Sequence, residues 1–198
     1  MIKVIIFDLG GVLFTNGTKR FIEFVSQTYQ LDKKKITEVM DGNIGTLYRE
    51  AKISRDEFWQ RFIKDLAITG DADQLEDKWI NSYELIEGTR DILQTLSKHY
   101  KIYFLSDNVK ERIDKINAKH DFLKWFADGV FSYEVGVRKP HPKIYQIALN
   151  KTGVKAEEAV FIDDKAPFTI PAQELGMLTF VFETPEKLRK DLKKNSLL

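Results

Sequence analysis

Five short apolar runs, separated by helical patterns, constrain the fold of this chain more than any other feature. The first, Val4–Phe7 in "VIIFDLGGVLF", contains only β-branched and aromatic residues, the pattern of a strand buried on both faces. The other runs lie within residues 101–108, 129–136, 159–166 and 177–183. Helical periodicity covers 89–100 and 141–153, and a helix capped by Thr184 with Pro185 at its first position follows the last run. This alternation predicts an α/β fold with a doubly wound parallel sheet.

The segment between the first two runs has a different character, because it contains no convincing strand. The stretch 19–29 reads as an amphipathic helix, and 54–66 opens with the capping box Ser54 and Glu57. We therefore expect a catalytic core formed by 1–15 and 88–198, with a helical cap domain inserted over 16–87.

Composition excludes several classes of function. The 198 residues carry a formal net charge of +1, which gives no reason to expect nucleic acid or an anionic membrane as partner. The chain has no cysteine, which excludes disulfides, thiolate chemistry and cysteine-based zinc sites. Asp8 interrupts the first apolar run, and no run approaches the ~18 residues that span a bilayer. We expect a soluble cytoplasmic protein, either a monomer or a homodimer.

Polar side chains follow the apolar runs at the points where the strands should end. They are Asp8, Ser106, Asp107, Lys139 in the loop "GVRKPHP", Asp163 and Asp164. The carboxyl ends of parallel strands meet at one edge of a sheet, where ligands bind in doubly wound folds. Clustered carboxylates are offset by a divalent cation, and ligands that are all oxygen favour Mg²⁺. A lysine and a hydroxyl beside that cation suit a phosphoryl group, with Asp8 placed as a carboxylate nucleophile.

Four motifs, "FDLGGVLF", "FLSDN", "GVRKPHPKIY" and "VFIDDKAPF", occur in this order at the predicted strand ends. In this the chain resembles the haloacid dehalogenase-like superfamily, and its phosphatases more than its dehalogenases. The resemblance covers the core from end to end, and the helical insert lies where the family places its C1-type cap. It implies a HAD-like Rossmannoid core and a Mg²⁺-dependent phosphatase of small phosphorylated metabolites, with sugar phosphates, including sugar 1-phosphates, as the expected class.

The resemblance also implies roles for single residues. Asp8 would attack phosphorus and form an aspartyl-phosphate, with Ser106 and Lys139 as further catalytic residues. The substrate would be contacted by Ser106, Asp107, Gly11 and Lys139. Mg²⁺ would be held by Asp8, the main-chain carbonyl of Gly10 and Asp163, while Asp164 would act mainly through metal-bound water.

Two positions depart from the family pattern. Most of these phosphatases have an aspartate, the general acid/base, two residues after the nucleophile, whereas this chain has Gly10. A positioned general acid contributes about 10²–10⁴-fold to the rate, so we expect slow turnover of ordinary alkyl phosphates. Asp107 stands where the family usually has asparagine. A carboxylate beside a bound phosphate is unfavourable unless it turns away or is protonated.

Two alternatives remain open at this point. A hydrolytic dehalogenase would use the same aspartate to attack carbon and would need no metal, but the "IDD" carboxylates argue against it. A catalytically weak binding or regulatory protein is the second, suggested by Gly10 and Asp107.

Overall fold

A five-stranded parallel sheet forms the centre of the molecule, with strand order β3-β2-β1-β4-β5. The computed structural model describes residues 1–198. The strands are β1 (Val4–Phe7), β2 (Lys101–Ser106), β3 (Asp128–Phe131), β4 (Ala159–Asp163) and β5 (Leu178–Val181). The α/β class and the parallel sheet predicted from the sequence are confirmed.

The central strand β1 pairs with β2 on one side and β4 on the other. Phe7, its last residue, lies level with Phe104 of β2 and Ile162 of β4. The backbone N–H of Asp8 continues this ladder by donating to the Ile162 carbonyl at 2.8 Å. This register places the residues that follow β1 beside the carboxyl end of β4.

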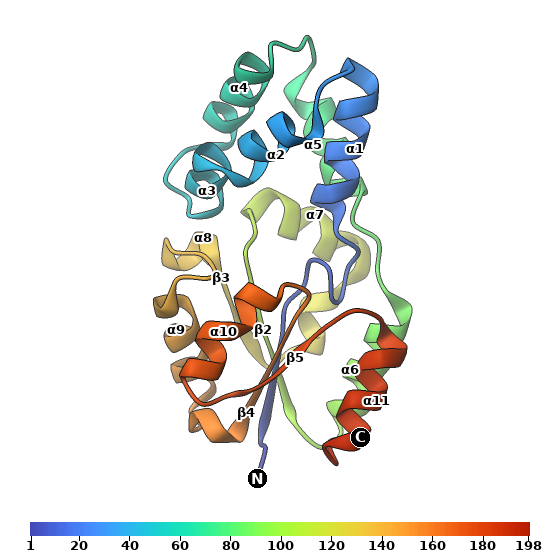
Figure 1. The fold of residues 1–198 in the computed structure, drawn as a ribbon, viewed down its shortest axis with the longest axis vertical. Coiled ribbons are helices and arrows are strands. Elements are labelled where there is room, and N and C mark those ends of the chain that lie inside the picture. The colour runs from blue at the N-terminus through green and yellow to red at the C-terminus, as the bar shows by residue number, and fades with distance from the viewer.

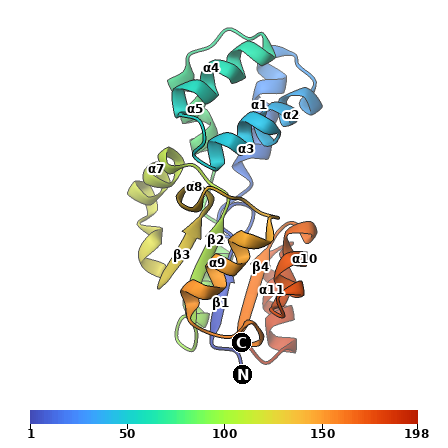
Figure 2. The same ribbon diagram turned by 90° about the vertical axis from the view of Figure 1, so that its left-hand side faces the viewer.

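Helices cover both faces of the sheet (Figures 1 and 2). Alternate residues of β1 face opposite ways: Ile5 and Phe7 join one apolar cluster, and Val4 and Ile6 join the other. The first cluster includes residues of α6, α7 and α11, and the second includes residues of α9 and α10. The bounds are α6 (Glu87–Leu96), α7 (Lys110–His120), α9 (Pro142–Thr152), α10 (Ala166–Glu174) and α11 (Pro185–Lys194), with 3-10 turns η1 (Phe122–Trp125) and η2 (Ala156–Glu158).

Five helices between β1 and α6 form a separate layer beyond the carboxyl ends of the strands, at the top of Figure 1. They are α1 (Gly17–Tyr29), α2 (Lys33–Asp41), α3 (Asn43–Arg49), α4 (Arg55–Leu66) and α5 (Ala72–Asn81). The Ser54 side chain accepts from the Glu57 backbone N–H, as its capping position predicts. We propose that this layer is the cap domain over 16–87. None of the helices is long and apolar enough to cross a membrane.

The apolar run 129–136 does not continue as a strand. It turns after β3 into the one-turn helix α8 (Ser132–Val135), which ends at Gly136 with a φ of 67°. Ser132 explains the change, because its buried hydroxyl donates to the Arg49 carbonyl of the cap and accepts from the Asn108 backbone N–H. The predicted helix 89–100 also differs, since α6 spans Glu87–Leu96.

We expect Phe62→Ala to destabilise the protein by about 3–5 kcal/mol, because large buried side chains leave cavities when truncated. Phe62 is fully buried among aromatic rings of the cap that belong to the same apolar cluster as one face of the sheet. Urea unfolding measures the change, with Ile170→Ala at a half-exposed position as the control, expected within about 0.5 kcal/mol of wild type. A loss below 1 kcal/mol for Phe62→Ala would contradict this packing.

Candidate active site

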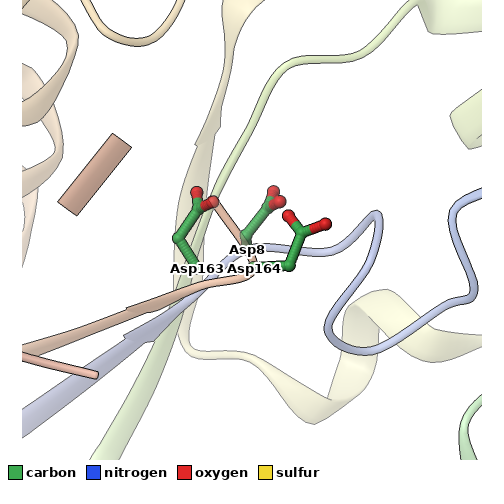
Figure 3. A group of neighbouring side chains, drawn as sticks. All are labelled: Asp8, Asp163 and Asp164. Carbon is green, nitrogen blue, oxygen red and sulfur yellow. The ribbon is translucent and has the colours of Figure 1, made fainter. Parts of the chain in front are cut away.

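Three carboxylates converge where β1 and β4 end. Asp8 follows β1, Asp163 is the last residue of β4, and Asp164 follows it. One oxygen from each lies within 4.8 Å of the others, and Figure 3 shows the three carboxylates pointing to the same side. The sequence prediction that these residues meet is confirmed by this geometry.

A single buried lysine links two of these carboxylates. The Lys139 Nζ lies 2.5 Å from Asp163 Oδ2 and 3.1 Å from Asp8 Oδ1, and the lysine is 2% exposed. Its ammonium also lies over the ring of Phe168, at 5.3 Å from the centroid. Buried charges persist where they are paired, and this pairing leaves three carboxylates against one ammonium.

The excess of negative charge appears in the pKa values. Burial raises the pKa of Asp8 to about 7; Lys139 opposes that rise, while Asp163 and Asp164 add to it. Burial and the neighbouring Asp163 likewise raise the pKa of Asp164. Burial would lower the pKa of Lys139, but Asp163 and Asp8 raise it, so the lysine stays charged. The cluster therefore favours an additional cation.

Gly11 leaves room for one of the carboxylates. A Cβ atom on this glycine would overlap the Asp164 carboxylate, and the φ of +97° is one that other residues rarely adopt. Asp164 Oδ1 is buried and has no hydrogen-bond partner in the protein. An orphaned carboxylate oxygen in a set of oxygen donors fits a hard cation, so the residues present suit Mg²⁺.

The two polar residues predicted at the end of β2, Ser106 and Asp107, have different partners. Ser106 is buried, and its Oγ accepts from the Asn108 side-chain amide at 3.2 Å. Asp107 accepts from the backbone N–H of Lys139 at 3.0 Å and from Arg138 Nε at 3.1 Å. The Asp107 carboxylate is thus neutralised and holds the segment that carries the catalytic lysine candidate.

A cavity of about 430 Å³ lies between the strand ends and the cap helices. Five predicted site residues line it: Asp8, Gly10, Ser106, Asp107 and Lys139. Gly11, predicted to contact substrate, does not line this cavity and instead packs against Asp164. Seven cationic side chains against four carboxylates line the cavity, so it favours anions.

Thr18, Tyr83 and Arg112 are among the lining residues that the sequence reasoning missed. The Arg112 side chain is 1% exposed and donates to the Tyr83 hydroxyl at 2.6 Å. A signal was present: Arg112 lies three residues after Val109 and four before Ile116, on the apolar face of its helix. Tyr83 lies in a connecting segment, where no periodicity marks it.

Comparison with known proteins identifies relatives of this chain. A family model described as haloacid dehalogenase-like hydrolase matches residues 2–173. The D-ribitol-5-phosphate phosphatase of Bacteroides thetaiotaomicron is 24% identical over 201 residues, which cover 97% of each chain. A glyceraldehyde 3-phosphate phosphatase of Methanocaldococcus jannaschii is 26% identical and aligns over 90% of this chain and 84% of its own.

Solved structures share the fold. A HAD family enzyme of Bacteroides thetaiotaomicron, solved as a magnesium complex, superposes with a TM-score of 0.77 at 27% identity, covering 92% of this chain and 94% of its own. An L-2-haloacid dehalogenase of Xanthobacter autotrophicus, at 18% identity and a TM-score of 0.69, covers 100% of this chain and 85% of its own, and shows the same fold. With the family model matching most of its length, this chain belongs to the haloacid dehalogenase-like hydrolases.

We expect Mg²⁺ to stabilise the folded protein, because a cation that binds only the folded state adds about 2.7 kcal/mol at 100 times its Kd. Thermal unfolding with Mg²⁺ and with a chelator measures this. Asp164→Asn removes one anion of the cluster, so the chelated variant should melt higher than chelated wild type and gain less from Mg²⁺.

Asp65→Asn is the matched control, because Asp65 is an exposed cap residue without an ion pair. This variant should gain as much from Mg²⁺ as wild type. An equal Mg²⁺ response in Asp164→Asn and wild type would contradict the assignment of the site.

Proposed function

We propose that this protein is a Mg²⁺-dependent phosphatase of small phosphorylated metabolites that acts through an aspartyl-phosphate on Asp8. The observation that carries the proposal is the convergence of Asp8, Asp163 and Asp164 around the buried Lys139 ammonium, beside a cavity that is lined by more cationic side chains than carboxylates. Relatives named D-ribitol-5-phosphate phosphatase and glyceraldehyde 3-phosphate phosphatase support it, as does the HAD family enzyme of Bacteroides thetaiotaomicron solved with magnesium and inorganic phosphate. Sugar phosphates, including sugar 1-phosphates, remain our expected substrate class.

Asp8, Lys139 and Ser106 have separate roles in the proposed reaction. An Asp8 carboxylate oxygen bonds to phosphorus as the bond from phosphorus to the leaving-group oxygen breaks, and that oxygen takes up a proton. Water then attacks the phosphorus, which frees inorganic phosphate and Asp8. The Lys139 ammonium favours the ionised form of Asp8, whose pKa burial raises. Ser106 Oγ already accepts from Asn108, which leaves its hydroxyl proton free to donate to a phosphoryl oxygen.

The cation would be held by the carboxylates of Asp8 and Asp163 and the main-chain carbonyl of Gly10, with Asp164 contacting it through water. When bound, Mg²⁺ supplies positive charge that offsets the carboxylates and the transferring phosphoryl group.

Gly10 has space beside it that the ring of Tyr83 borders. A Cβ atom on Gly10 would lie 3.5 Å from Tyr83 Cε1, an ordinary contact, so the first carbon of a side chain meets no clash there. Space at Cβ therefore does not require glycine, and without a general acid at this position the leaving-group oxygen depends on other donors.

The function is tested by phosphate release from a panel of sugar phosphates, nucleotides and an activated aryl phosphate. We expect release that requires Mg²⁺ and falls by at least about 10³-fold in Asp8→Asn, since the amide is a far weaker nucleophile. Metal-independent halide release from a 2-haloacid would support the dehalogenase alternative. Binding of Mg²⁺ and phosphate without any turnover would support the binding protein.

Gly10→Asp tests the missing acid. We expect kcat/KM for an alkyl phosphate to rise about 10-fold or more, and for an activated aryl phosphate to change little, because only the poorer leaving group needs a proton. Gly10→Asn is the matched control, with the same shape and no proton to transfer. Equal effects of the two substitutions, or equal effects on both substrates, would contradict the role assigned to this position.

A further inference from the structure

Arg112 is the one fully buried cation of this protein that has no carboxylate partner. The other two are paired, Arg49 with Asp41 and Lys139 with Asp8 and Asp163. Every recorded acceptor of Arg112 is neutral: the Asn108 side-chain oxygen, the Tyr83 hydroxyl at 2.6 Å and, at a longer 3.4 Å, the Asp107 carbonyl. A buried, uncompensated charge is unfavourable and calls for an anion.

The guanidinium of Arg112 is held in a fixed orientation. Its central carbon lies 4.5 Å from the ring centroid of Trp79 and 4.5 Å from that of Tyr83. The two rings pack against the guanidinium, whose N–H groups lie along its edge. Three of its five N–H groups donate hydrogen bonds within the protein, so two remain for a ligand. A planar edge with spare donors suits a carboxylate or a phosphate, which it can contact with two parallel hydrogen bonds.

The hydroxyls of Thr18 and Tyr83 add a further donor beside this edge. They share one hydrogen bond of 2.7 Å, which uses one of their two protons. Thr18 also accepts from the Trp79 indole N–H, and Tyr83 accepts from Arg112. Neither hydroxyl has another acceptor in the protein, and both residues line the cavity with Arg112. One hydroxyl proton is therefore available to a ligand.

The position of these groups separates them from the phosphoryl site. Thr18 and Trp79 belong to cap helices, and Arg112 reaches Ser106 only through Asn108. Positive charge gathers on this side: burial lowers the pKa of Arg49 to about 10, Asp41 opposes the shift, and Arg138 and Arg112 add to it. Asp8 lines the same cavity as Thr18, Tyr83 and Arg112, so a substrate whose phosphorus lies at Asp8 can extend along the cavity toward this wall.

We propose that Arg112, with the hydroxyls of Thr18 and Tyr83, forms a second anion subsite that binds an acidic group on the leaving-group part of the substrate. The proposal rests on the phosphatase function. It narrows the substrate class to phosphomonoesters that also carry a carboxylate or a second phosphate. A carboxylate and a phosphate share the chemistry that this subsite needs: each has anionic oxygens that accept hydrogen bonds from the guanidinium edge and from a hydroxyl.

The test compares three-carbon substrates that differ at the far end. Glycerol 3-phosphate has a hydroxyl there, 3-phosphoglycerate a carboxylate, and 2-hydroxypropane-1,3-diyl bisphosphate a second phosphate. We expect wild type to prefer at least one acidic substrate over glycerol 3-phosphate by about 10-fold or more in kcat/KM, the scale of hydrogen bonds to charged groups. The favoured one identifies the source of the anion.

Variants locate the preference. Arg112→Gln should reduce it to about 3-fold or less, Arg112→Lys should retain part of it, and Thr18→Val should weaken it without removing the charge. Lys119→Gln is the matched control: it removes an exposed charge from the same helix, outside the cavity, and should keep the full preference. No preference in wild type, or an equal loss for all three substrates in Arg112→Gln, would overturn the subsite.

A binding measurement separates this proposal from the phosphatase function. Calorimetry of 3-phosphoglycerate, the bisphosphate and glycerol 3-phosphate with the Asp8→Asn protein needs no turnover. Tighter binding of an acidic ligand that the additional change Arg112→Gln removes supports the subsite even if no phosphatase activity is found. Equal affinity for all three ligands overturns the subsite even if the phosphatase activity is confirmed.

Discussion

The pairing of Lys139 with Asp8 and Asp163 is the interaction on which the rest of this site depends. One buried ammonium stands against three carboxylates, and Asp164 keeps a buried oxygen without a partner. The register of the sheet imposes this crowding, because β1 and β4 end side by side. The lysine is in turn positioned by Asp107, which accepts from its backbone N–H. A divalent cation completes the charge balance that the protein leaves open.

Much of this arrangement follows from sequence, for a physical reason. Asp8 follows one strongly apolar strand and Asp163 ends another, and parallel strands bring such ends together, so their meeting was predictable. Asp107 was harder, because its carboxylate is neutralised by Arg138, 31 residues away. Arg112 lies on the apolar face of its helix, but its partner Tyr83 lies in a connecting segment without periodicity, so their contact could not be predicted. The strand in 129–136 ends at Phe131 for a similar reason, because the Ser132 hydroxyl donates a hydrogen bond to the carbonyl of the cap residue Arg49.

Gly10 and the cavity wall formed by Thr18, Tyr83 and Arg112 are adjacent, because Tyr83 borders both. Leaving-group chemistry in this chain lacks a carboxylic acid next to the nucleophile, and Tyr83 packs beside the space where that side chain would stand. Gly17 allows the same approach from the cap, because a Cβ atom there would overlap the Tyr83 ring. The tyrosine joins Thr18 of the cap to Arg112 of the core, so this wall of the cavity includes residues of both layers.

The central claim is that Asp8 is phosphorylated during turnover, and chemical trapping tests it most directly. Protein quenched with acid while turning over a phosphomonoester in Mg²⁺ is treated with borohydride, which reduces an acyl phosphate to an alcohol. Peptide mass spectrometry should then find homoserine in place of aspartate at position 8, only when substrate and Mg²⁺ are both present. Unmodified Asp8 under conditions of rapid phosphate release, or reduction at another carboxylate, would contradict the account.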